Sequence, residues 1–125
     1  MESISTIGVY EVQFIFDGEI YKVIKITGPA HNMLGLSFVE NNSVSNSVEI
    51  IPLQAKNDEA SNISASEVQQ QVVAAITEMN AKFRINYKVA KIQFVPSDTP
   101  ATNIYKELAI ELINRVIMKG KFIRV

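Results

Sequence analysis

The segment VYEVQFIFDGEIYKVIKITG, residues 9–28, contains two β-rich runs joined by Asp17 and Gly18. An Asp-Gly pair between alternating hydrophobic residues predicts a β-hairpin with a two-residue type I′ turn, because that turn needs positive φ at both central residues. Such a turn pairs Phe16 with Glu19 and places the aromatic side chains of the hairpin on one face. We expect this aromatic face to lie in the core.

The other face of the hairpin is more apolar than a solvated face needs to be. It carries five aliphatic side chains around a polar centre of Glu11, Gln13 and Lys22, and the five are Val9, Ile15, Ile20, Ile24 and Ile26. Something must cover this surface if the helices cover the aromatic face, either a segment of the same chain or a partner. We predict that these five residues form a partner interface.

The rest of the chain predicts further strands over residues 33–40, 48–54 and 86–95, and helices over residues 63–83 and about 99–119. Residues 121–125 can add a terminal strand. Pro52 cannot donate a ladder hydrogen bond, so its strand belongs at an edge of the sheet. Ser64 and Glu67 have the spacing of a capping box, which marks the start of the first helix. The apolar residues of this helix recur at helical spacing and predict its buried side, and they are Val68, Val72, Ala75, Ile76, Met79 and Phe83.

The predicted order is ββββ–α–β–α in a single domain that spans residues 1–125. Strands that precede helices in this way favour an α+β fold. We predict two layers, with a largely antiparallel sheet of about five to six strands and two helices on one face.

The composition excludes several classes of function. The 125 residues include no cysteine and one histidine, and the formal net charge is −1 with dispersed basic residues. We therefore predict no metal site, no cofactor, no catalytic residue and no nucleic-acid partner. Gly-rich phosphate loops and the GxSxG motif are absent from the sequence, so the chain is more consistent with a binding protein than with an enzyme.

The sequence predicts neither membrane insertion nor secretion. It contains no uncharged apolar run of 18 residues, and MESISTIGVY lacks the features of a signal peptide. The absence of cysteine agrees with a reducing compartment, so we expect a soluble cytoplasmic protein.

The stretch PSDTP, residues 96–100, admits two interpretations. Asp98 or Thr99 can cap the following helix, with Pro100 at its first position, and we favour this role. In the alternative, Asp98 belongs to a ligand site with His31, which lies in the predicted loop GPAHN, and with Tyr105 along its wall. The alternative requires the two loops to meet in the folded protein.

The leading functional prediction is a small protein-binding protein, for example an inhibitor of the immunity or antitoxin type. Its partner is another protein or a second copy of the chain, and a structural homodimer would use the aliphatic hairpin face between copies. Acidic residues can steer an inhibitor toward a basic partner, and the candidates are Glu40, Glu49, Asp58 and Glu59. A small enzyme or ligand-binding module at His31 and Asp98 is the alternative from another class.

Overall fold

The computed structural model describes residues 10–27, 30–40, 48–53, 63–96, 98 and 103–125. The strands are β1 (Tyr10–Phe16), β2 (Tyr21–Thr27), β3 (Ala30–Glu40), β4 (Glu49–Pro52), β5 (Tyr87–Phe94) and β6 (Ile123–Arg124), and the helices are α1 (Ala65–Phe83) and α2 (Ile104–Ile117). The order ββββ–α–β–α–β confirms the predicted α+β class and the terminal strand.

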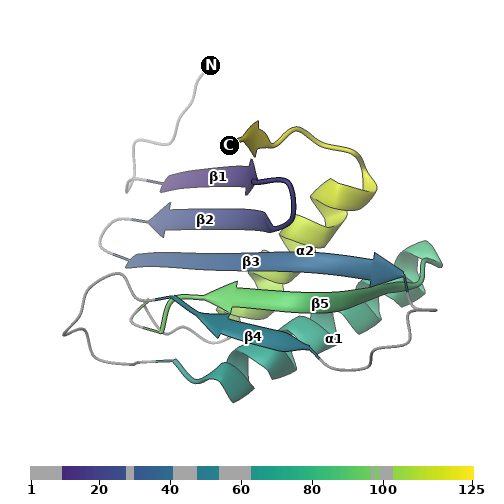
Figure 1. Cartoon of the computed structure of the whole chain (residues 1–125), viewed down its shortest axis with the longest axis horizontal. Coiled ribbons are helices and arrows are strands. Elements are labelled where there is room, and N and C mark those ends of the chain that lie inside the picture. The colour runs from purple at the N-terminus through teal and green to yellow at the C-terminus, as the bar shows by residue number, and fades with distance from the viewer. Residues whose placement is uncertain (1–9, 28–29, 41–47, 54–62, 97, 99–102) are drawn as a thin grey trace.

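All six strands form one mixed, largely antiparallel sheet in the order β4-β5-β3-β2-β1-β6. The pairs β1–β2, β2–β3 and β3–β5 are antiparallel, whereas β4–β5 and β1–β6 are parallel. Pro52 ends β4, which is an edge strand as predicted. Both helices lie behind the sheet in Figure 1, so they cover the same face. We call this face the helix face and the opposite one the open face.

The core lies between the helices and the helix face. The strand registers place the buried side chains of the sheet on this face, and they are Val23, Leu34, Leu36, Val89, Ile92 and Phe94. The helices contribute Val68, Val72, Ala75, Ile76, Met79, Tyr105, Leu108, Ala109, Leu112 and Ile113. The buried side of α1 recurs at helical spacing, as the sequence predicts.

The hairpin forms, but its predicted turn is wrong. Phe16 pairs with Tyr21 instead of Glu19, and the Asp17 N–H donates to the Ile20 carbonyl at 3.3 Å. The two residues at the tip are therefore Gly18 and Glu19. Gly18 has a φ of 100° and Glu19 has no positive φ, which excludes a type I′ turn and fits a turn with Gly at its first central position. The pairing shifts by two residues, so every side chain keeps its predicted face.

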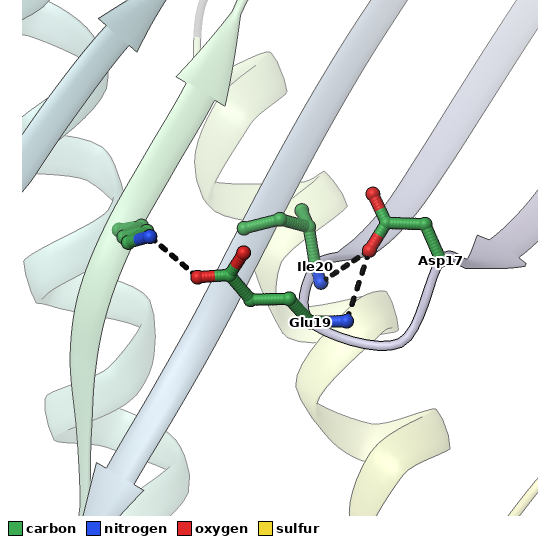
Figure 2. A network of polar contacts seen from close by, with 4 residues as sticks. Asp17, Glu19 and Ile20 are labelled. Atoms are coloured by element: carbon green, nitrogen blue, oxygen red, sulfur yellow. Dashed lines mark hydrogen bonds and ion pairs between the residues drawn. The ribbon is translucent and has the colours of Figure 1, made fainter.

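The hairpin tip folds over the open face (Figure 2). Asp17 Oδ1 accepts hydrogen bonds from the backbone N–H groups of Ile20 and Glu19, at 2.8 and 2.9 Å. These two donors hold the pKa of the Asp17 carboxyl below its ordinary value. The Glu19 carboxylate extends across the sheet to Lys91 on β5 and forms an ion pair with it. The tip thus reaches from β2 to β5 over β3.

The start of α1 agrees with the sequence, and the start of α2 does not. Ser64 and Glu67 form the predicted capping box of α1. Helix α2 begins at Ile104, its N-cap residue Asn103 makes no side-chain capping bond, and Thr99 and Pro100 lie outside the described residues. The prediction that Asp98 caps the helix is wrong, because its carboxylate is bound to β3, as described below.

A side chain of α1 performs the missing cap of α2. Gln71 Oε1 accepts hydrogen bonds from the backbone N–H groups of Tyr105 and Lys106, at 2.9 and 3.1 Å. These groups are among the first N–H donors of α2, which have no partner within their own helix. Packing of α1 against α2 therefore determines where α2 begins.

We expect Gln71→Ala to lower the free energy of unfolding by about 1–2 kcal/mol, since two N–H donors at the start of α2 lose their acceptor. Gln70→Ala is the matched control, because Gln70 is the exposed neighbour on the same helix and none of the hydrogen bonds described here involves it. Urea denaturation of both variants measures the difference. Equal losses of stability in the two variants would contradict the capping role of Gln71.

Candidate functional site

A cluster of polar side chains lies at the beginning of β3, and His31 and Asn32 are its first two members. His31 belongs to β3 and not to a loop, which corrects the predicted location. The register pairs it with Ile26 on the open face, and its side chain is 59% exposed. Asn32 points to the helix face and is buried. Alternation along one strand thus sends these neighbours to opposite faces.

Asp98 joins this cluster from the segment that follows β5. It is 1% exposed, and its Oδ1 lies 3.4 Å from His31 Nε2. Its Oδ2 accepts a hydrogen bond of 2.8 Å from the backbone N–H of Met33. Strand β5 ends at Phe94, which lies opposite Leu34, so β5 offers no partner residue for Met33. The Asp98 carboxylate accepts the Met33 N–H instead. Asp98 of PSDTP and His31 of GPAHN therefore meet, as the ligand-site interpretation requires.

Tyr105 completes the cluster from the first turn of α2, but it does not line an open wall. The side chain is 2% exposed, and Asn32 Nδ2 donates to its hydroxyl at 3.4 Å. Burial raises the pKa of Tyr105 to about 12, and the neighbouring charge of Asp98 acts in the same direction. Tyr105 is thus a buried neutral phenol between the helix face and the polar cluster.

The raised pKa of Tyr105 predicts a loss of stability in alkali. The folded protein binds the phenolic proton more tightly than the unfolded chain, whose tyrosine has the ordinary value of 10.0. The stabilisation is complete below pH 10 and is lost as the pH rises through 12, with a total of about 3 kcal/mol. Tyr105→Phe should remove this part of the pH dependence, as measured by urea denaturation across the range. An unchanged slope in the variant would refute the assignment.

The cluster offers an exposed imidazole backed by a buried carboxylate. This arrangement can position the His31 ring against a polar ligand, as in acid–base sites. Within the described part of the chain, no group of three His, Asp or Glu side chains could hold a metal ion. Two cavities lined by described residues lie elsewhere, one of about 230 Å³ beside Tyr21, Phe38 and Tyr87 and one of about 480 Å³ along α1.

The open face is the second candidate, and it keeps most of its predicted aliphatic residues. Ile15, Ile24 and Ile26 are partly exposed on it, and the registers add Met33 and Ile51. None of these five side chains packs on the described core, and neither helix covers this face. Ile24 and Met33 are direct cross-strand partners, whereas Ile15 lies opposite Lys22 and Ile51 lies opposite Gln93 of β5.

Ile20 does not belong to an accessible interface. It is 3% exposed, because the hairpin tip presses it onto β3 at Gly35. Val9, Asp58 and Glu59 lie outside the described residues, and only the backbone of Glu40 is described, at the end of β3. Glu49 is exposed on β4, the edge strand farthest from β6.

The sequence did not reveal Asn32, Met33 or Ile51 as site residues. The unbroken register from β2 to β3 identifies the first two, but the predicted third strand began at residue 33 and had no assigned partner. Ile51 joins the open face through the parallel pairing of β4 with β5. Local alternation could not have indicated this pairing, because it depends on the crossover through α1.

Comparison with known proteins identifies no relative, since no family model, no curated protein and no solved structure matches the chain. In the described part of the chain, no helix is long and apolar enough to cross a membrane. The geometry of the two candidate sites is therefore the basis for any functional assignment.

Proposed function

We propose that the chain is a protein-binding domain that uses its open face. The observation that carries this proposal is the set of five partly exposed aliphatic residues on the face opposite both helices, which are Ile15, Ile24, Ile26, Met33 and Ile51. The solvated face of an antiparallel sheet normally carries polar side chains. Large exposed apolar patches usually mark interaction surfaces. Contact with a partner would bury these side chains.

The partner in this proposal is another protein or a second copy of the chain. An inhibitor of the immunity or antitoxin type is one concrete form, because such a protein needs a compact scaffold and no chemistry of its own. The absence of cysteine favours the cytoplasm as its location. A homodimer joined by the two open faces is the other form.

The test is affinity capture from cells that produce the tagged chain at native level, in parallel with an Ile24→Glu variant. We expect one stoichiometric partner, or the chain itself at dimer mass, with the original protein and a loss of at least tenfold with the variant, because a buried carboxylate opposes association. Val73→Glu is the matched control, since Val73 is 46% exposed on α1. Equal capture by Ile24→Glu and the original chain would refute the proposal.

A second candidate function is ligand binding at the polar cluster. Contact between the exposed His31 ring and the buried Asp98 carboxylate favours it, because paired groups of this kind position a ring for proton exchange or polar recognition. The test is a small-molecule fragment screen by NMR with His31→Gln as the matched variant. A fragment that shifts the His31 ring signals and fails to bind the variant supports this function, whereas a screen without such a fragment contradicts it.

A further inference from the structure

The segment that follows α2 exposes an unusual share of apolar surface. Met118, Ile123 and Val125 are 66%, 54% and 79% exposed, and they are three of the five large hydrophobic side chains that are exposed among the described residues. Ile123 pairs with Ile15 in the parallel register of β6 with β1. Its side chain therefore extends the open face to the outer edge of the sheet.

The same segment is strongly basic. Residues 115–125 include four basic residues and no acidic one, in a chain with a net charge of −1. Arg115 is engaged, because its Nε donates to the Lys121 carbonyl at 2.7 Å and its guanidinium lies 4.2 Å from the Phe14 ring centroid. Lys119, Lys121 and Arg124 take part in none of the ion pairs of the described residues. All three cations thus lack a carboxylate partner within the described part of the chain, but the Arg124 guanidinium is held against an aromatic ring, 5.0 Å from the Phe16 ring centroid.

The backbone of β6 is paired on one side. The Val125 N–H donates to the Phe16 carbonyl at 3.2 Å, which ties the segment to β1. Beyond β6 the sheet has no further strand in the described part of the chain. Although β6 has only two residues, its outer edge can accept an additional extended strand through main-chain hydrogen bonds.

Charge decides which strand fits. A second copy joined edge to edge would place the basic residues of both copies against one another, and like charges across neighbouring strands are destabilising. An acidic strand would supply the missing counter-charges, and its aliphatic residues would contact Ile123 and Val125. The partner segment at this edge is therefore acidic. It differs in charge from the basic partner that acidic residues such as Glu49 were predicted to attract.

We propose that the outer edge of β6 docks an extended segment of the partner protein in which acidic and aliphatic residues alternate. This inference rests on the proposed function, since the docked segment would continue from the open face onto the edge. Beyond the proposed function, it specifies the charge pattern of one segment of the partner and the edge of the sheet where that segment binds.

The test uses a short fluorescein-labelled peptide of alternating glutamate and valine, measured by fluorescence anisotropy, and its counterpart with lysine. We expect the acidic peptide to bind the full chain and the lysine peptide not to bind. The double variant Lys121→Glu/Arg124→Glu should weaken binding about tenfold or more, because the attraction between these two cations and the glutamates of the peptide becomes repulsion. Lys82→Glu/Arg84→Glu carries the same charge change at the end of α1 and should bind normally.

Three results would overturn the inference: no binding of the acidic peptide, equal binding of both peptides, or equal weakening in the two double variants. Vesicles that contain phosphatidylserine are the second probe. Their binding without peptide binding, lost in Lys121→Glu/Arg124→Glu, would assign the patch to a membrane surface instead. The capture experiment with Ile24→Glu is independent of these measurements, so a partner that requires Ile24 while the peptide fails leaves the proposed function standing and removes only this inference.

Discussion

Replacement of Asp98 by alanine is expected to lower the free energy of unfolding by about 3 kcal/mol, the largest loss for a polar residue of this protein. The carboxylate is 1% exposed and accepts from the Met33 N–H at 2.8 Å. Its removal leaves that N–H without an acceptor at a point where β5 has already ended. It also removes the charge that lies 3.4 Å from His31 Nε2.

Two further variants separate the contributions of Asp98. Asp98→Asn keeps an oxygen that can accept from Met33, so we expect a loss of only about 1 kcal/mol. His31→Gln removes a side chain that is 59% exposed, and its effect should lie within about 0.5 kcal/mol. Urea denaturation of the three variants gives the order Asp98→Ala, Asp98→Asn, His31→Gln. A loss for His31→Gln as large as that for Asp98→Ala would show that the contact with His31, and not the backbone bond to Met33, provides the stability.

Substitution of Gly35 by valine should destabilise the protein by about 2–3 kcal/mol, because it overpacks the contact between β3 and the hairpin tip. A Cβ atom at position 35 would lie 2.9 Å from Ile20 Cγ2 and 3.2 Å from Gln93 Cβ. The sign of the effect is informative, since valine is favoured over glycine in strands and would stabilise β3 in the absence of this contact.

A double-mutant cycle with Ile20→Ala identifies the cause. Ile20→Ala alone removes a buried side chain and should cost about 2–3 kcal/mol. In the double variant the new valine occupies the space of Ile20, so the combined loss should be at least 1 kcal/mol smaller than the sum of the single losses. Additive losses would mean that the tip does not pack on Gly35.

The features that the sequence predicted correctly depend on local patterns. Alternation in residues 9–28 defined the two faces of the hairpin. The predicted turn was wrong, but the face assignments were correct because the pairing shifted by an even number of residues. The capping box at Ser64 requires only four consecutive residues, and it is present. The helical periodicity of α1 also identified its buried side.

The features that the sequence did not predict depend on contacts between distant segments. Helix α2 begins where Gln71 of α1 can accept its N–H groups, whereas its N-cap residue Asn103 forms no side-chain capping bond. Ile20 is buried because the tip crosses to Lys91, about 70 residues later in the chain. The sequence predicted Asp98 as a helix cap, because that role requires only an oxygen near free N–H groups. In the structure its carboxylate accepts the N–H of Met33 on β3, which is 65 residues away in the chain.

The most direct test of the central claim is photo-crosslinking from the open face. A benzophenone side chain at position 24 should give a single crosslinked species of discrete mass in cells, because the proposed partner covers Ile24. The same group at position 73, on the exposed side of α1, should give none. If position 24 yields no intermolecular product while position 73 does, the open face is not the binding surface.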